Sequence, residues 1–408
     1  MSVLDGFHVA TALDGAGWHP AAWREAGARP AALFTPEYWT GLVGEAERGL
    51  LDFVTLDDAL GLQSSRRGVA DDRVDRVRGR LDAVLTAARV APTSTGIGLV
   101  PVATTTHTEP FHASKAVATL DYISGGRAGV QARVSATALE AGQFGRRTVP
   151  DLRDDTGPGD ATGPGDGQFV ADLFDEAADF VEVMRRLWDS WEDGAEIRDV
   201  ATGRFVDRDK LHPIDFEGRW FSVRGPSITP RPPQGQPVVA VLAHVPVAFR
   251  LAARCADVVF VTPRSAEDVG AVVSTVRAAE RAVGRSGDPL RVFIDLMVFL
   301  DDEPGAAARR RQGLDDLDGR VHRSDAAIFT GTPHELTDLM TVWHRQGVTG
   351  FRLRPAVLPH DLEAVTRRLV PLLQDRGVFR TGYGDGTLRG RLGLARPANR
   401  YATAGPAL

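Results

Sequence analysis

The chain has 408 residues, of which 43% are hydrophobic, so it is long enough to bury a sizeable core in one large domain or in two. Its formal net charge of −6, from 54 acidic and 48 basic residues, gives no electrostatic basis for binding nucleic acid or an anionic membrane. The single cysteine, Cys255, excludes an internal disulfide, and without a charged leader or an apolar run of about eighteen residues the protein is expected to be cytoplasmic.

Predicted strands and helices alternate along the whole chain. Short apolar runs mark the strands, and apolar residues at spacings of three and four mark the helices. The predicted strands are residues 7–12, 53–56, 97–102, 130–135, 238–242, 258–262, 292–300 and 350–353. The predicted helices are residues 36–46, 81–89, 110–124, 174–191, 246–255, 266–283, 334–346 and 361–375. Eight such pairs with no second core signature predict an α/β protein, a (β/α)8 TIM barrel, as one domain over residues 1–408.

Two predicted insertions interrupt this alternation, one after the fourth strand and one before the fifth. The first, about residues 151–168, contains the sequence TGPGD twice, at 156–160 and 162–166. Because Gly, Pro and Asp bury little apolar surface, this insertion is expected to be mobile, either as a surface loop or as a lid. The second, about residues 195–236, has no helical period and is expected to be extended.

The most informative stretch is 97–135, which contains a strand, a crossover helix and a second strand. Pro110 suits the first turn of the helix, and Gly125 and Gly126 suit its end. The turn at 104–107 must then lie at the carboxyl edge of a parallel sheet, where α/β proteins bind their ligands. Function is therefore expected at this edge.

Sequence motifs in the same stretch carry a family resemblance. They are TTTH at 104–107, EPF at 109–111 and SGGRAG at 124–129, and further similar runs are HPIDFEGRWFSVRGP, TPRPPQGQPVV and the RLGL tail. With these motifs the chain resembles the bacterial luciferase-like flavin monooxygenases, in the branch of the nitrilotriacetate and dibenzothiophene-sulfone monooxygenases. The resemblance covers nearly the whole chain.

This resemblance implies an oxidoreductase that binds reduced FMN in the barrel mouth and uses O₂ to oxygenate a small organic substrate. A separate reductase would supply the reduced flavin, and the chain would form a homo-oligomer. His107 and Asp58 are the implied catalytic residues. The implied cofactor contacts are Thr104, Thr105, Gln131, Arg133, Ala243, His244 and Val245.

The chain departs from the family pattern where the flavin phosphate is expected. Relatives usually have a glycine and two serines after the fifth strand, whereas residues 243–246 here read AHVP. Phe174 stands where relatives tend to have a tyrosine that bonds the phosphate. Two phosphate contacts are therefore missing, and His244 with Arg146 and Arg147 would have to replace them.

Three interpretations of function remain open at this point. The first is a two-component flavin monooxygenase, the second a deazaflavin-dependent hydride-transfer enzyme, and the third a barrel that has lost flavin binding and acts as a binding or scaffolding protein. Other chemistries lack their motifs, since the sequence has no GxGxxG, P-loop, HExxH or GxSxG. The substrate is not readable, because the loops after the strands determine it.

Overall fold

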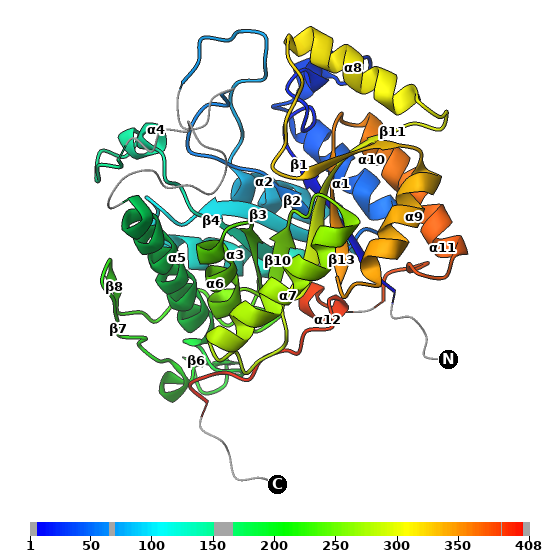
Figure 1. Ribbon diagram of the computed structural model, residues 1–408. Coiled ribbons are helices and arrows are strands. Elements are labelled where there is room, and N and C mark those ends of the chain that lie inside the picture. The colour runs from blue at the N-terminus through cyan, green and yellow to red at the C-terminus, as the bar shows by residue number, and fades with distance from the viewer. Residues whose placement is uncertain (1–5, 65–69, 151–165, 385, 403–408) are drawn as a thin grey trace.

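The computed structural model describes residues 6–64, 70–150, 166–384 and 386–402. Eight parallel strands close into a barrel in the order β1, β2, β3, β4, β9, β10, β11, β13, and β13 pairs back onto β1 (Figure 1). The strands are β1 (His8–Leu13), β2 (Phe53–Leu56), β3 (Gly98–Thr104), β4 (Gly129–Arg133), β9 (Val238–Ala243), β10 (Val258–Val261), β11 (Arg291–Leu300) and β13 (Gly350–Pro355). The predicted TIM barrel is confirmed.

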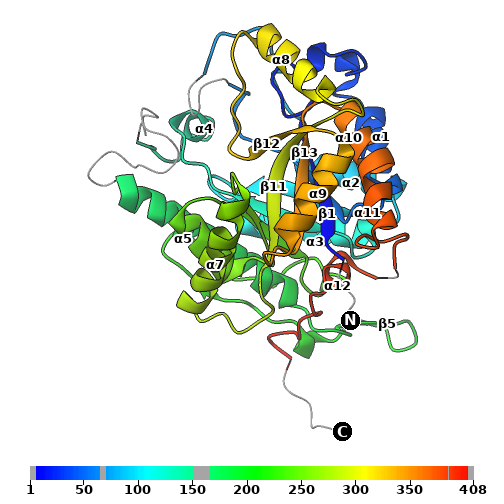
Figure 2. The same ribbon diagram turned by 45° about the vertical axis from the view of Figure 1, so that its right-hand side comes forward.

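Helices surround the barrel, as Figures 1 and 2 show from two directions. They are α1 (Pro36–Arg48), α2 (Ala83–Val90), α3 (Pro110–Ser124), α5 (Asp166–Asp189), α6 (Pro246–Cys255), α7 (Ala266–Ala282) and α9 (Pro333–His344), followed by α10 (His360–Ala364), the π-helical turn η5 (Val365–Leu369) and α11 (Val370–Asp375). Local chemistry sets their ends: Gly125, at φ 64°, ends α3, and a capping box of Thr332 and Glu335 begins α9. Within the described ranges no helix is long and apolar enough to cross a bilayer.

An apolar cluster fills the barrel interior near the amino ends of the strands. Phe53, Phe260 and Phe293 pack with ring centroids 5.4–6.2 Å apart. The short helix α12 (Leu388–Arg391) packs against this cluster, and a Cβ on Gly98 would lie 2.7 Å from a methyl group of Leu388. Because Phe53 and Gly98 begin β2 and β3, α12 closes the amino end of the barrel, which leaves the carboxyl end for a site.

Three parts of the structure differ from the sequence prediction or add to it. Strand β12 (Ala327–Gly331) and helix α8 (Ala306–Asp318) were not predicted, and β12 pairs with the outer half of β11. Helix α5 begins at Asp166, so it starts before the predicted residue 174 and includes the last residues of the predicted mobile insertion. The remainder of that insertion, residues 151–165, lies outside the described residues. Whether the insertion is a surface loop or a lid therefore stays a prediction.

The segment expected to be extended, 195–236, contains two short antiparallel ladders. These are β5 (Glu196–Asp199) with β6 (Arg204–Val206), and β7 (Phe216–Glu217) with β8 (Ser222–Val223). The lone Cys255, at the end of α6, is a buried helix residue, as predicted.

Candidate active site at the carboxyl end of the barrel

The carboxyl ends of β2, β3 and β4 are joined by hydrogen bonds among the predicted site residues. Arg133 donates from Nη1 to the Asp58 carbonyl at 2.5 Å, and its own carbonyl accepts the N–H of Thr105 at 2.8 Å. The Thr105 hydroxyl donates to the same carbonyl at 3.0 Å. The structure therefore brings Asp58, Thr105 and Arg133 together at one edge of the barrel, and Thr105 uses its hydroxyl to join two strands.

His107 follows β3 in a strained and buried position. Its φ is 74°, its exposed fraction is 5%, and its ring stacks on Phe144 with centroids 5.2 Å apart. Among the described residues neither ring nitrogen has a hydrogen-bond partner. A buried polar group without a partner costs free energy, so this ring is arranged for a partner that the described part of the chain does not supply.

The protonation of His107 follows from its surroundings. Burial lowers the pKa of His107, and Arg147 lowers it further, while Glu140 and Glu176 oppose the shift. The ring is therefore neutral at pH 7, with one nitrogen as donor and the other as acceptor. Such a ring can bond two different groups of a ligand.

Asp58 is anchored by the backbone around it. Its two carboxylate oxygens accept the N–H groups of Ala59 at 2.7 Å and Ala83 at 3.0 Å. Burial raises the pKa of Asp58, and these two donors partly offset the shift. The carboxylate thus joins the end of β2 to the start of α2, which is a positioning arrangement; its predicted catalytic role stays a prediction.

The neighbouring Asp57 lies closer to the charged groups of the mouth. Its carboxylate pairs with Arg80 at 3.1 Å, and Arg80 also pairs with Asp14 after β1 at 2.8 Å. Burial raises the pKa of Asp57, Asp14 raises it further, and Arg80, Arg133 and Arg354 oppose the shift. Asp57 and Asp58 are adjacent in the sequence after β2, and only Asp58 was predicted as a site residue.

A network of buried charges, which sequence reasoning missed, occupies the barrel centre above the apolar cluster. Asp295 of β11 accepts hydrogen bonds from both Arg352 and Arg354 of β13, and all three side chains are at most 3% exposed. Arg352 also donates to the side-chain oxygen Oε1 of Gln131 at 2.5 Å and stacks on Phe260, with its Cζ 3.6 Å from the ring centroid. The sequence FRLRP at 351–355 has two arginines two residues apart. Because residues two apart on a strand share a face, this pattern indicates a pair of charges on one side of β13.

The same network includes Gln131, which was predicted to contact the cofactor through its amide. Its side-chain oxygen accepts the bond from Arg352, and Gln131 is 7% exposed, so the cofactor contact stays a prediction. The network continues outward to Asp325, which accepts Arg354 Nη1 at 2.6 Å. Partial desolvation opposes ionisation of the half-exposed Asp325, but Arg354, with His244 and Arg352, holds the pKa of Asp325 well below its ordinary value.

The predicted phosphate end lies where β9 meets α6. Ala243 ends β9, Val245 caps α6 without a side-chain hydrogen bond, and Pro246 occupies the first turn. His244 lies between them, within electrostatic range of Asp325. Of the predicted substitutes for the missing hydroxyls, Arg147 forms a two-bond pair with the buried Glu176 at 2.7 and 2.8 Å. A phosphate bound by Arg147 would therefore compete with Glu176 for the guanidinium group.

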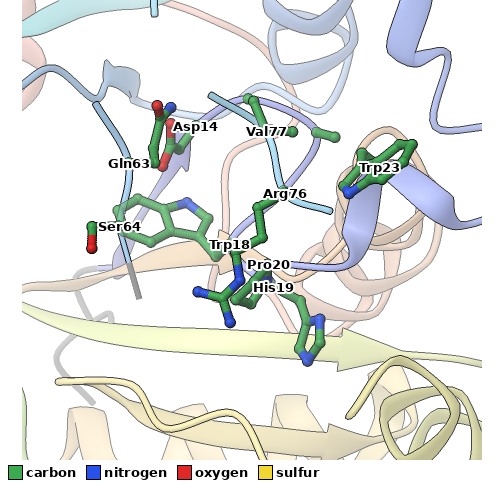
Figure 3. Close-up of a pocket in the computed structure, with 12 residues that line it drawn as sticks. Asp14, Trp18, His19, Pro20, Trp23, Gln63, Ser64, Arg76 and Val77 are labelled. Carbon is green, nitrogen blue, oxygen red and sulfur yellow. The ribbon is translucent and has the colours of Figure 1, made fainter. Parts of the chain in front are cut away.

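Beside the mouth lies a small cleft of about 130 Å³, shown in Figure 3. The turn after β1 contributes Trp18 and Trp23, and the loop before α2 contributes Gln63 and Arg76. The Trp18 ring centroid lies 4.6 Å from Cζ of Arg354, so this indole forms part of both the cleft and the mouth. Within the described ranges no three His, Cys, Asp or Glu side chains gather as a metal site would require.

The histidine pair next to this cleft makes stability depend on pH. The rings of His19 and His322 lie edge to face at 5.0 Å, and burial, then His19, lowers the pKa of His322 to about 4. An unfolded histidine titrates near 6.5, so between these values the unfolded chain binds one more proton than the folded chain. We expect the free energy of unfolding to fall by about 2–3 kcal/mol from this residue as pH falls through this window.

Urea unfolding of the wild type and of His322→Phe between pH 7 and 4.5 measures this effect. The variant should lose less stability than the wild type on acidification, whereas the exposed His112→Phe should follow the wild type. If the free energy of unfolding falls equally with pH in the wild type and in His322→Phe, the low pKa assigned to His322 is contradicted.

Residues 16–347 match the sequence profile of the family described as luciferase-like monooxygenase. The chain belongs to the luciferase-like monooxygenase family. It is 30% identical to N-acetyl-S-(2-succino)cysteine monooxygenase of Bacillus subtilis (strain 168), over 96% of this chain and 97% of that protein. It is also 30% identical to nitrilotriacetate monooxygenase component A of Aminobacter aminovorans, over 95% of this chain and 96% of that protein. A solved riboflavin lyase, with modified FMN and riboflavin, shares the fold at a TM-score of 0.81 and 24% identity, over 95% of this chain and 96% of the other.

The family implies a flavin, and the residues of this luciferase-like monooxygenase fit the ring end of one. Besides the two nitrogens of His107, the hydroxyl of Ser135 is buried without a partner among the described residues. A flavin ring presents both donors and acceptors at its polar edge, which suits these groups. At the phosphate end, the candidate donors are His244 and the N–H groups of Val245 and Val247, because Pro246 has no N–H and the N–H groups of Ala248 and Phe249 donate to the Val245 carbonyl.

Proposed function

We propose that this luciferase-like monooxygenase is the oxygenating component of a two-component system. It would bind reduced FMN made by a separate reductase and transfer one atom of O₂ to a small organic substrate, while the other atom leaves as water. Support comes from the family membership and from the relative that is named as component A. Assembly as a homo-oligomer and a cytoplasmic location stay predictions.

One observation carries the proposal for this chain's own residues: His107 is buried with both nitrogens unpartnered within the described part of the chain. When bound, reduced flavin supplies the electrons for activating O₂. His107 would hold the polar edge of the flavin ring, and as a neutral imidazole it could pass a proton between the site and the substrate. Phe144, stacked on the imidazole, would shield it from water.

The other predicted contacts divide into two groups. Thr104, Thr105 and Arg133 would border the ring, with Thr105 and Arg133 also fixing the edge formed by β3 and β4. His244 and the first turn of α6 would hold the phosphate, and the positive end of the helix dipole favours an anion there. Asp58 would act by keeping β2 and α2 in place.

The source of electrons provides the test. Since the sequence has no dinucleotide-binding fingerprint, the purified protein with NADH and FMN should not oxidise NADH. Added to a flavin reductase, it should bind the reduced FMN and slow its direct oxidation by O₂. Rapid NADH oxidation without a reductase would refute the two-component assignment, and retention of a reduced deazaflavin but not of reduced FMN would favour the deazaflavin interpretation.

A further inference from the structure

The barrel centre contains two buried arginines but, among the described residues, only one buried carboxylate that bonds them both. Arg352 and Arg354 both bond Asp295, and the three side chains are at most 3% exposed. A buried charge without a counter-charge is strongly disfavoured, so a second carboxylate is required. Asp325 provides it.

Asp325 reaches Arg354 from outside the barrel. It lies in the segment between α8 and β12, and 44% of its side chain is exposed. Its oxygens accept the two Nη groups of Arg354 at 2.6 and 3.2 Å. This is the fork geometry in which a guanidinium binds any carboxylate, whether from the chain or from a ligand.

The Asp325 carboxylate lies near positively charged or protonatable groups that suit an anion. Trp18 covers the guanidinium of Arg354, and Arg352 and His244 lie within electrostatic range of Asp325. Trp18 also lines the cleft of Figure 3, so a molecule in that cleft contacts the same indole that covers Arg354.

The backbone around Asp325 is fixed independently of its side chain. Arg264, after β10, donates to the carbonyl of Ser324 at 3.1 Å and to that of Ala326 at 3.3 Å. These two bonds hold the residues on either side of Asp325. Rotation of the Asp325 side chain would break its bonds with Arg354 and with the Ser324 hydroxyl, but not these two backbone bonds.

We propose that Arg354 binds a carboxylate group of the substrate, and that the Asp325 side chain holds this position until the substrate carboxylate replaces it. The exchange replaces one carboxylate on Arg354 by another while Asp295 keeps its own bond, so the buried guanidinium keeps its counter-charge. The substrate class is a small organic acid in its anionic form. This inference rests on the proposed function only in taking the barrel mouth as the substrate site.

Calorimetric titration with succinate tests the exchange without any flavin. Asp325→Asn removes the competing charge and keeps the shape, so it should bind succinate about tenfold more tightly than the wild type if Asp325 holds the position about nine-tenths of the time. The matched control is Asp338→Asn, which removes one charge from an exposed pair with Arg376. Asp338→Asn should bind succinate with the affinity of the wild type. Neutral succinamide should not bind to any of these proteins.

A second variant locates the binding. Arg354→Lys in the Asp325→Asn background should lose the tenfold gain, because lysine cannot form the two-bond fork. Succinate binding by Asp325→Asn no tighter than by the wild type, equal binding of succinamide, or a full gain retained by the double variant would each overturn the proposal. If the double variant fails to fold, the comparison of Asp325→Asn with the wild type and the control decides. Reduced FMN binding, measured separately, can fail or succeed without changing this outcome.

Discussion

Replacing Asp295 by asparagine is expected to lower the free energy of unfolding by about 3–5 kcal/mol. Asp295 is fully buried and bonds Arg352 and Arg354, so its loss leaves Arg354 with Asp325 and leaves Arg352 without a bonded carboxylate among the described residues. Breaking a buried ion pair by removing one partner costs far more than the pair contributes when both partners are present.

Urea unfolding measures this loss, and Asp338→Asn serves as its control. That residue forms an exposed ion pair with Arg376, with 69% of the Asp338 side chain accessible, so its removal should cost about 0–1 kcal/mol. A loss below about 1 kcal/mol for Asp295→Asn would mean that the network is dispensable for folding.

Replacing His107 by phenylalanine is expected to weaken binding of reduced FMN by roughly 10- to 100-fold. The new ring keeps the stack on Phe144 but offers no nitrogen to a ligand. Since both nitrogens lack a partner among the described residues, folding stability should stay the same or rise. The pairing of weaker flavin binding with unreduced stability distinguishes a ligand-binding residue from a structural one.

Anaerobic titration with reduced FMN and a thermal unfolding curve provide the two readouts for this variant. The exposed His112, on α3, is the control position, and His112→Phe should change neither value. Unchanged flavin binding by His107→Phe would remove His107 from the site.

The fold was largely predictable because the barrel strands are short apolar runs. All eight barrel strands match predicted runs, and their parallel order follows once helices alternate with them. Helix α8 was missed because its sequence AAARRRQGLDDLD has few apolar residues, and β12 because it is a half-exposed addition to β11 outside the barrel. Neither segment has the strong apolar periodicity on which such predictions depend.

The candidate site was predictable only in its location. Topology puts the turn after β3 at the carboxyl end, and His107 follows from that. Partners across the barrel are not visible in a linear sequence: Asp295 and Arg352 are 57 residues apart, and Gln131 and Arg352 are 221 apart. Asp58 was chosen over Asp57 because nothing local shows which carboxylate the backbone binds and which faces the arginines of the mouth.

The central claim, that this luciferase-like monooxygenase uses reduced FMN, is tested most directly by anaerobic calorimetric titration of the wild type with reduced FMN. The account predicts one site per chain with a dissociation constant of about 1–10 μM, and weaker binding by His107→Phe. No binding of reduced FMN at concentrations up to about 1 mM, with a protein that is folded by thermal unfolding, would contradict it.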